Sequence, residues 1–277
     1  MKYLRVSAIA NKIVLVTGGA SGIGKLMGEY CLRQNAKTLI IWDIDGDKLK
    51  QVEENFLALG FSIEATQINL TDTAAIQQAA EAILLKHGVV DILFNNAGII
   101  TSNQFFYNMD HTEIDRTMQV NTVAHLHVTR SFLPAMIQQK SGHIINISSA
   151  AGFIPNPRLS VYCASKHAIS GWSESLRLEL ESMNGDFHVT TVTPAYIDTG
   201  MFAGVRSPLI PIAKPEVAAR SIIKGVLKNK VYVRIPGIVY IAPFFKGILP
   251  VRWADFLVGK VFGFAKSMDE FKGRNTK

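Results

Sequence analysis

The feature that most constrains this chain is a glycine-rich segment near its N-terminus, placed between an apolar run and a helix-like run. Residues 13–16 are Ile-Val-Leu-Val, residues 17–24 are Thr-Gly-Gly-Ala-Ser-Gly-Ile-Gly, and residues 25–32 have helical character. A strand, a glycine turn and a helix in this order can bind a phosphate through main-chain N–H groups at the helix N-terminus. Glycine is required because a Cβ would block close approach and disfavour positive φ angles. An ordinary strand-to-helix turn has the same pattern, so the rest of the chain must decide.

The remainder of the chain alternates between strand-like and helix-like segments. Strands are predicted at residues 13–16, 38–43, 62–70, 91–95, 142–149, 187–193 and 230–235, and helices at 25–32, 45–59, 71–87, 112–139, 160–183 and 215–227. This alternation implies a doubly wound α/β fold, in which helices cover both faces of a parallel seven-stranded sheet of the Rossmann type. We expect one such domain over residues 1–235 and a C-terminal amphipathic extension over residues 236–277.

Asp43 lies at the predicted end of the second strand, about 20 residues after the glycine turn, where such sheets bind ligands. Its carboxylate could accept hydrogen bonds from the ribose hydroxyls of an adenosine and would repel a 2′-phosphate. Ile44 follows it, and Ser21 rather than a basic residue lies in the glycine turn. These residues predict NAD as the cofactor rather than NADP. The alternative is that Asp43 caps the next helix together with Asp45.

Tyr162 and Lys166 are four residues apart on a predicted helix and therefore share one face. A nearby ammonium favours the phenolate and lowers the tyrosine pKa from its usual value of about 10. Tyr162 could then act as a general base for an alcohol and as a general acid in reverse. Ser149 could hold the substrate oxygen, and Ser148 is the alternative residue for this role. The pair could also be a packed aromatic residue and an exposed helix charge.

Four motifs in this order resemble the short-chain dehydrogenase/reductase family over roughly residues 11 to 235. They are Thr17-Gly18-x-x-x-Gly22-x-Gly24, Asn95-Asn96-Ala97-Gly98, Ser149 thirteen residues before Tyr162-x-x-x-Lys166, and Pro194-Ala195-Tyr196-Ile197-Asp198-Thr199. A C-terminal turn at residues 249–252, Leu-Pro-Val-Arg, resembles the branch with retinol dehydrogenases and lipid-associated 17β-hydroxysteroid dehydrogenases. Two positions depart from the family pattern, Asn69 where Asp is common and Ala195 where Gly is common.

The resemblance implies hydride transfer between NAD(H) and an alcohol or carbonyl substrate. The implied catalytic residues are Asn121, Ser149, Tyr162 and Lys166. The implied cofactor-binding residues are Gly18, Ser21, Gly22, Ile23, Gly24, Asp43, Asn69, Leu70, Asn95, Ala97, Gly98, Tyr162, Lys166, Pro194, Ile197 and Thr199. Asn121 is implied to hold a water that links Lys166 to solvent. A homodimer or homotetramer is implied through the helices at 112–139 and 160–183. The alternative is an NAD-binding sensor or scaffold without turnover.

Apolar residues follow several of these motifs and predict an apolar substrate pocket. They lie in residues 200–205 after Thr199, in Ile99, Ile100, Phe105, Phe106 and Tyr107 after Gly98, and in Phe153, Ile154 and Pro155 after Ser149. Such a pocket favours a lipophilic substrate that is long-chain, retinoid-like or steroid-like.

The C-terminal extension has apolar residues at helical spacing, Trp253, Phe256, Leu257, Val261 and Phe264, with Arg252, Lys260 and Lys266 around them. A basic amphipathic helix of this kind suits a membrane interface. A lid over the body or a dimer contact would explain the pattern as well. Prolines at 236, 243 and 250 argue against a spanning helix.

The hydrophobic share of 48% and the charged share of 18% allow a large core and exclude a disordered chain. The net charge is +7, with eight basic and three acidic residues in 234–277, and we expect solvated surface rather than nucleic-acid binding. No metal site is expected, because metal-ligand spacing is found neither for Cys31 and Cys163 nor for His143, His167 and His188. The three histidines are predicted at the surface or at strand edges. No signal peptide is evident, and a cytoplasmic protein, free or peripheral to a membrane, is expected.

Overall fold

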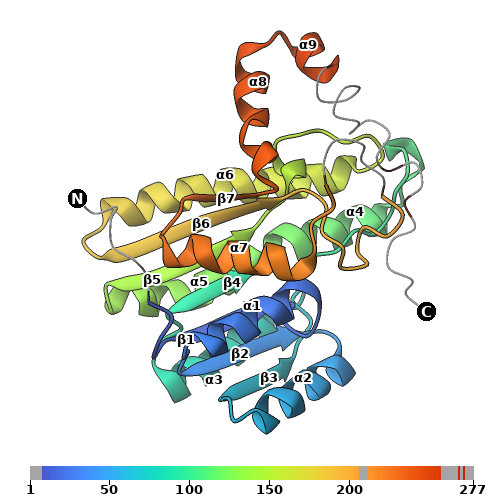
Figure 1. The fold of residues 1–277 in the computed structure, drawn as a ribbon. Helices are drawn as coiled ribbons and strands as arrows, with labels where there is room; N and C mark the ends of the chain where they lie inside the picture. Colours follow the sequence, from blue (N-terminus) through green and yellow to red (C-terminus); the bar gives the residue numbers. More distant parts are fainter. Residues whose placement is uncertain (1–7, 206–210, 257–267, 269–270, 272–277) are drawn as a thin grey trace.

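A computed structural model of the chain describes residues 8–205, 211–256, 268 and 271. Seven parallel strands form one sheet in the order β3-β2-β1-β4-β5-β6-β7 (Figure 1). Their bounds are β1 Ile13–Thr17, β2 Thr38–Asp43, β3 Ile63–Gln67, β4 Ile92–Asn95, β5 Ser141–Ile147, β6 Asp186–Pro194 and β7 Tyr232–Ile235. The predicted seven-stranded doubly wound sheet is therefore confirmed.

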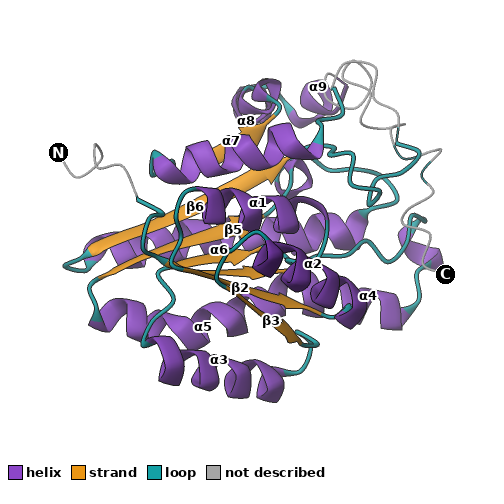
Figure 2. Cartoon of the chain, turned by 60° about the horizontal axis from the view of Figure 1, so that its bottom comes forward, coloured by secondary structure: helices purple, strands orange, loops and turns teal. Residues whose placement is uncertain are grey.

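Helices cover both faces of the sheet (Figure 2). One face packs against α1 Gly22–Arg33, α2 Gly46–Ala58 and α7 Pro215–Leu227. The other packs against α3 Thr73–His87, α5 Ala124–Gln138 and α6 Ser160–Ser182. The shorter elements are α4 His111–Met118, α8 Ala242–Ile248, α9 Val251–Asp255, the 3₁₀ turns η2 Phe106–Asn108, η4 Ala150–Gly152 and η5 Gly237–Tyr240, and the π-helical turn η3 Gln119–Val123.

The order of the strands reverses between β1 and β4, and this reversal positions the site. Val16 of β1 lies opposite Ile41 of β2 on one side and Phe94 of β4 on the other. The carboxyl ends of three strands therefore emerge at one level, and the loops that follow them part to either side. Open α/β sheets bind ligands in the crevice that forms at such a point.

The long helix predicted over residues 112–139 is interrupted at η3, between α4 and α5. Asn121 and Thr122 in this turn are buried, and both hydrogen-bond to groups outside their own helix. Extra residues in a helical turn of this kind often mark functional sites. The strand predicted over residues 62–70 ends earlier, at Gln67, because Asn69 begins a turn in which its Oδ1 accepts from Thr71 N at 3.1 Å.

His143 does not lie at the surface, so this prediction is wrong. It sits on β5, is 3% exposed, and its Nε2 lies 2.8 Å from Thr190 Oγ1 of β6. β5 is an inner strand whose two faces are both covered by helices, which explains the burial. Burial and the neighbouring His188 lower the pKa of His143 to about 3, so its ring is neutral at physiological pH.

The segment after β7 leaves the sheet. The turn η5 and helices α8 and α9 project beyond the helices that cover the sheet (Figure 1). The helix predicted from Trp253 begins as α9, and its continuation through residues 257–264 lies outside the described residues. Within the described ranges, no helix has both the length and the apolar character needed to cross a bilayer.

Candidate active site

A cavity of about 480 Å³ opens at the carboxyl ends of the strands. Most of the predicted site residues line it: Gly18, Ser21, Gly22, Ile23, Gly24, Asp43, Asn69, Leu70, Ala97, Gly98, Ser149, Tyr162, Lys166, Pro194, Ile197 and Thr199. Asn95 and Asn121 do not line it, because both are fully buried behind its wall. Met201 and Phe202, from the segment predicted to form an apolar pocket, line it as well, as does Asn96 of the fourth-strand motif. The sequence interpretation missed other lining residues, among them Ile44, Thr71, Arg116 and Val120.

The glycine turn has a conformation that only glycine adopts without strain. Gly18 and Gly22 have φ angles of +65° and +55°, in the left-handed region. A Cβ on Gly24 would lie 2.2 Å from Gly18 O and 2.6 Å from Asn96 Nδ2. The turn and the first residues of α1 are therefore packed against the loop after β4, with no room for a side chain between them.

Thr17 and Asn96 hold this turn in place. Thr17 Oγ1 accepts hydrogen bonds from Asn96 N at 2.9 Å and Ala97 N at 3.1 Å. In return, Asn96 Nδ2 donates to Thr17 O at 2.9 Å and to Gly18 O at 3.1 Å. The four bonds join the ends of β1 and β4, so the walls of the cavity are built before any ligand enters.

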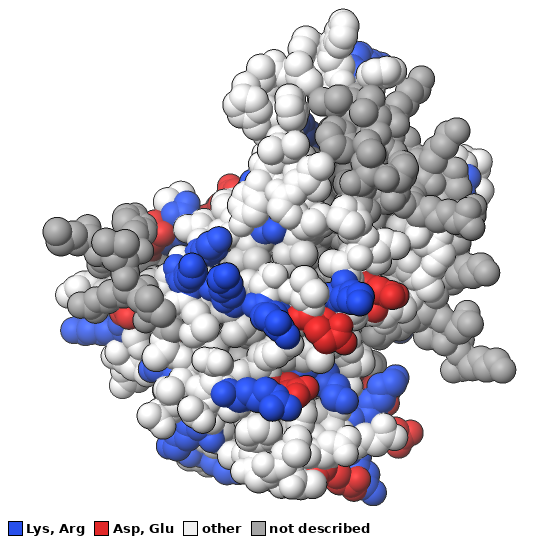
Figure 3. Space-filling view, in the orientation of Figure 1, with Lys and Arg blue, Asp and Glu red and all other residues white. Residues whose placement is uncertain are grey.

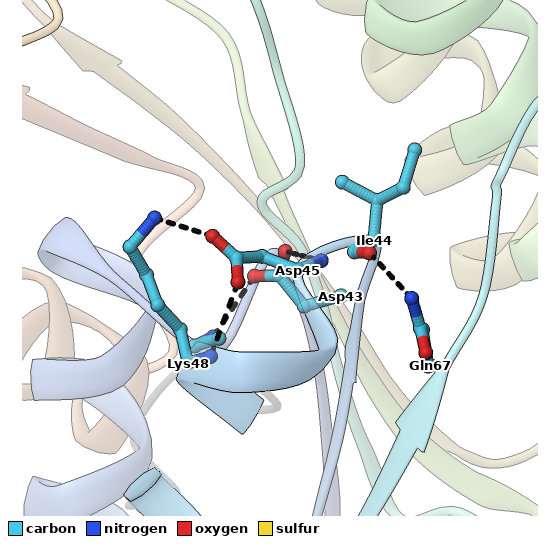
Figure 4. Close-up of polar contacts among 6 residues, drawn as sticks. Asp43, Ile44, Asp45, Lys48 and Gln67 are labelled. Carbon is cyan, nitrogen blue, oxygen red and sulfur yellow. Dashed lines mark hydrogen bonds and ion pairs between the residues drawn. The ribbon is translucent and has the colours of Figure 1, made fainter. Parts of the chain in front are cut away.

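Asp43 faces the cavity at the end of β2, and it is Asp45, not Asp43, that caps α2 (Figure 4). Asp45 Oδ1 accepts from Lys48 N at 3.1 Å, and Lys48 Nζ forms an ion pair with the same carboxylate. Asp43 Oδ2 accepts from Ala20 N of the glycine turn at 3.0 Å, and Oδ1 from Asp45 N at 3.2 Å. The Asp43 carboxylate is therefore held beside the turn by two main-chain N–H groups, while Lys48 is paired with Asp45.

Tyr162 and Lys166 lie one turn apart on α6 and are 7% and 3% exposed. Lys166 Nζ lies 5.9 Å from the centre of the Tyr162 ring and donates to Ile147 O at 2.9 Å. Ser149, just after β5, hydrogen-bonds to the Tyr162 side chain and donates to Pro194 O at 3.3 Å. Three groups that can handle a proton or an oxygen thus meet in one wall of the cavity.

Burial governs the acidity of both α6 residues. It raises the pKa of Tyr162, and the hydrogen bond with Ser149 offsets this only in part. It lowers the pKa of Lys166 to about 8. The prediction of a lowered Tyr162 pKa is therefore wrong for this structure, because desolvation by burial disfavours the phenolate and raises the pKa instead. Tyr162 is a neutral phenol here, ready to donate its proton.

Ser148, the alternative to Ser149, also lines the cavity, but its hydroxyl is hydrogen-bonded to groups of α6. Ser148 Oγ donates to Lys166 O at 2.9 Å and lies 2.9 Å from Ser170 Oγ. It therefore braces the helix that carries Tyr162 and Lys166. The geometry favours Ser149 as the hydroxyl that can reach a substrate oxygen.

Asn121 is fully buried, and its side chain fastens the segment after Gly98. Its Oδ1 accepts from Ile99 N at 2.8 Å, and its Nδ2 donates to Ile99 O at 2.9 Å and to Ser165 Oγ at 3.2 Å. Both amide hydrogens are used by the protein. The implied water between Asn121 and Lys166 stays a prediction.

Asn95 belongs to a buried polar chain behind the cavity. Its Nδ2 donates to Thr129 Oγ1 of α5 and to Asn146 Oδ1 of β5, both at 2.8 Å. Asn146 Nδ2 donates in turn to Ser173 Oγ of α6 at 2.8 Å. The chain ties α5 and α6 to the sheet, so Asn95 positions the wall that carries Tyr162 without lining the cavity itself.

His125 is a further support residue that the sequence interpretation missed. It lies on α5, is 1% exposed, and its Nε2 lies 2.7 Å from Ala97 O. Burial and the charge of Lys166 lower its pKa to about 3, so it is neutral and its Nε2–H donates to Ala97 O. No local motif marks this residue, because its partner lies 28 positions away.

An apolar cluster borders the cavity beside Tyr162. Its buried members are Ala150, Ile154, Leu159, Tyr162, Cys163, Ala195, Tyr196, Val205, Val239 and Met268. Phe202 packs against it edge-on, with ring centres 6.4 Å from Tyr162 and 5.5 Å from Tyr196. Met201 and Phe202 also line the cavity, so the wall near Tyr162 is mainly hydrocarbon.

Phe105, Phe106 and Tyr107 were expected in this pocket, and this expectation is wrong. They are 49%, 60% and 80% exposed and are absent from the cavity wall. Phe105 stacks on Tyr107 with ring centres 6.0 Å apart, and the Arg158 guanidinium lies 5.2 Å above Phe105. These contacts hold the aromatic side chains on the outer surface of the loop.

Comparison with known proteins places this site in a recognised context. Residues 12–209 match the family model described as short chain dehydrogenase. The chain is 34% identical over 274 residues to epidermal retinol dehydrogenase 2 of Mus musculus, covering 97% of this chain and 88% of that protein. It is 31% identical over 258 residues to estradiol 17-beta-dehydrogenase 11 of Pongo abelii, covering 93% and 85%.

Two solved structures are similar over most of their length. A short chain dehydrogenase/reductase from Burkholderia phymatum in complex with NAD has a TM-score of 0.78 at 23% identity, covering 87% of this chain and 96% of that one. A metagenomic short-chain oxidoreductase in complex with NADP has a TM-score of 0.70 at 29% identity, covering 83% and 97%. The first likeness concerns the fold alone, and the two proteins carry different dinucleotides.

Proposed function

The chain belongs to the short-chain dehydrogenase family, and from this premise we propose that it transfers a hydride between NAD(H) and a lipophilic alcohol or carbonyl compound. The observation that carries the proposal is the meeting of Ser149, Tyr162 and Lys166 in the wall of the cavity that also holds the glycine turn. A proton donor and a glycine-lined cradle in one cavity are what a nicotinamide-dependent dehydrogenase requires.

The residues present fit a dinucleotide. Gly18 and Gly22 have no side chain to block approach to the turn, and any side chain at Gly24 would clash with the turn and the loop after β4. The N–H groups at the start of α1 suit a pyrophosphate. Asp43 suits the ribose hydroxyls, and Asn69 and Leu70 suit the adenine. Lys166 suits the nicotinamide ribose, and Pro194, Ile197 and Thr199 suit the carboxamide.

The proton chemistry follows from the positions of three side chains. When bound, the nicotinamide supplies the carbon that gives or accepts the hydride. In reduction, the Tyr162 hydroxyl donates its proton to the carbonyl oxygen, which Ser149 Oγ holds by a hydrogen bond. In oxidation, Tyr162 takes the alcohol proton back. Lys166, whose pKa is about 8, is mainly protonated at pH 7 and stabilises the phenolate that results.

The function is tested with a substrate panel of long-chain alcohols, retinol and hydroxysteroids, each with NAD and with NADP, followed by the absorbance of the reduced cofactor. We expect turnover of at least one lipophilic substrate. Turnover of small polar alcohols alone would contradict the substrate class. NAD binding in a calorimeter without any turnover would favour the sensor or scaffold alternative. The lipophilic class is supported by the hydrocarbon wall around Phe202 and by the names of the retinol and estradiol dehydrogenases that the chain resembles.

Cofactor preference is our first prediction. The Asp43 carboxylate would lie beside a 2′-phosphate, and like charges placed together cost several kcal/mol at an interface. We expect kcat/KM with NAD to exceed that with NADP by about tenfold or more. Asp43→Asn keeps one acceptor oxygen for the glycine turn and should narrow the ratio to about threefold or less. The control Asp47→Asn removes an exposed carboxylate from α2 and should leave the ratio unchanged. Equal use of both cofactors by the unmodified enzyme would refute the assignment.

We propose a homodimer or homotetramer that forms through α5 and α6. Leu126 and Ile137 on α5 and Leu178 on α6 are 36%, 39% and 58% exposed, so both helices offer apolar side chains to a second copy of the chain. We expect Leu178→Glu to shift the mass in sedimentation velocity toward the monomer, because a buried unpaired carboxylate opposes association. Leu85→Glu, at a 91% exposed position on α3, is the matched control and should keep the native mass. A monomeric unmodified protein would disprove this interface.

We place the protein in the cytoplasm, at the surface of a membrane. Cys31 and Cys163 are both free and buried, as expected in a reducing compartment. A peripheral position would bring the cavity close to lipophilic substrates.

A further inference from the structure

The segment from Gly237 to Phe256, which we name the C-terminal arm, exposes large apolar side chains along its length. Phe244 and Ile248 of α8 are each 64% exposed, and Val251 and Trp253 of α9 are 74% and 68% exposed. Helix α8 has no buried residue. Contiguous exposed apolar surface of this kind marks an interaction site.

The arm is nevertheless firmly attached at its base. The Arg234 guanidinium lies over three rings, 4.7 Å from that of Tyr232, 5.2 Å from that of Tyr240 and 5.5 Å from that of Phe153. The Tyr240 hydroxyl donates to Tyr232 O at 2.9 Å and accepts from Arg234 N at 3.3 Å, so it occupies main-chain groups of the edge strand β7. Such a base would hold the apolar side chains out from the body in a defined direction.

The charges of the arm favour one kind of partner. Between Pro236 and Ala254 the chain carries two basic residues, Lys246 and Arg252, and no acidic residue before Asp255. In Figure 3 the projecting part is mostly uncharged, and the charged atoms visible on it are basic. Aromatic and aliphatic side chains bordered by lysine and arginine match the boundary between acyl chains and anionic headgroups. A protein partner of acidic character would have little to pair with in this hydrocarbon surface.

We propose that the C-terminal arm docks onto a phospholipid membrane, inserting Phe244, Ile248, Val251 and Trp253 at the interface while Arg252 contacts the headgroups. Tryptophan suits this boundary because its ring is apolar and its N–H remains in contact with water. The arm lies on the membrane and does not span it, since α8 and α9 are seven and five residues long.

The base of the arm also touches the substrate side of the cavity, which links docking to the proposed function. Val239 is buried in the same apolar cluster as Tyr162 and Tyr196. Lys246 Nζ donates to Phe153 O at 2.7 Å, in the loop that follows Ser149. We therefore assign the arm a second task, which rests on the proposed function. It keeps the apolar part of the cavity wall at Met201 and Phe202 close to the lipid that supplies the lipophilic substrate.

The test is sedimentation of the full chain with vesicles of phosphatidylcholine that contain a minor share of phosphatidylserine. The variant Phe244→Glu/Val251→Glu/Trp253→Glu should lower the partition coefficient by about tenfold or more, because three charges replace the inserting side chains. The matched control is Leu57→Glu/Leu59→Glu/Leu85→Glu, which adds the same charge at positions 54%, 61% and 91% exposed. That control should lose less than about threefold from its added charge.

Tryptophan fluorescence gives an independent measurement. Trp42 is fully buried and Trp172 is partly buried, so a blue shift on adding vesicles should come from Trp253. The shift should vanish in Trp253→Phe, while vesicle binding persists. Neither assay requires turnover, so a failed docking proposal is distinguishable from a failed enzymatic one.

Two outcomes would overturn the proposal. One is vesicle binding by the triple arm variant at the level of the unmodified protein. The other is absent vesicle binding by the unmodified protein; a lower sedimentation mass for the arm variant would then show that a second copy of this chain covers the arm. If docking holds, turnover of a vesicle-borne substrate should fall in the arm variant, while turnover of a water-soluble alcohol stays the same.

Discussion

Replacing Tyr162 by phenylalanine is expected to lower kcat by about 10²–10⁴-fold while the Kd for NAD stays within about threefold. The change removes one hydroxyl and leaves a ring of the same shape in the apolar cluster beside Phe202. That hydroxyl is hydrogen-bonded to the Ser149 side chain, which holds the substrate oxygen in the proposed reaction, so the substitution removes the proposed proton donor. Steady-state kinetics with a lipophilic substrate and calorimetry with NAD are the two measurements.

The matched control is Tyr30→Phe, which removes a hydroxyl from α1 and should keep kcat within about twofold. Circular dichroism should show the same fold for both variants. If Tyr162→Phe kept more than about a tenth of the native kcat, the general acid would have to be another group. A loss of NAD affinity equal to the loss of kcat would instead indicate a structural role for this tyrosine.

Introducing one methyl group at Gly24 should weaken NAD binding by about a hundredfold, a free-energy change of roughly 3 kcal/mol. The Cβ of Gly24→Ala would lie 2.2 Å from Gly18 O and 2.6 Å from Asn96 Nδ2. Because Thr17 and Asn96 hold the turn by four hydrogen bonds, the methyl group can be accommodated only by moving α1 or the turn itself. Either movement shifts the N–H groups that the pyrophosphate requires.

Thermal melts with and without NAD measure this effect even if the variant is less stable. The unmodified protein should melt at a higher temperature with NAD, and Gly24→Ala should show little or no increase at the same concentration. Gly171→Ala on α6 is the control, because a Cβ there meets no atom within 4 Å. An unchanged Kd for Gly24→Ala would mean that the dinucleotide does not use this turn.

The family and the glycine-lined part of the cavity were predictable because their signals are local. The glycine turn lies directly between β1 and α1, and Tyr162 and Lys166 are one helical turn apart, so spacing alone brings each set together. The family match over residues 12–209 confirms the resemblance drawn from these motifs. The alternation of apolar strands and helices likewise predicted the seven-stranded sheet, because a parallel sheet buried on both faces demands continuous apolar strands.

The supporting residues were less predictable because their partners are distant in sequence. Asn95 looked like a cavity residue, yet its amide binds Thr129 and Asn146 behind the wall. Asn121 was read within one long helix, yet its bonds to Ile99 and Ser165 accompany a π-helical turn. His143 was expected near the surface because its sequence neighbours do not reveal that β5 is an inner strand.

By itself, the sequence determined the order of strands and helices, the glycine turn and the Tyr162–Lys166 pair, since each depends on residues within one or two turns of the chain. Tertiary structure alone decided which of these side chains share a cavity, that burial raises the pKa of Tyr162, and that the C-terminal arm stands away from the body with its apolar residues exposed. The physical reason is that burial and long-range contacts are properties of packed neighbours, and a residue's neighbours in space are set only when the whole sheet has assembled.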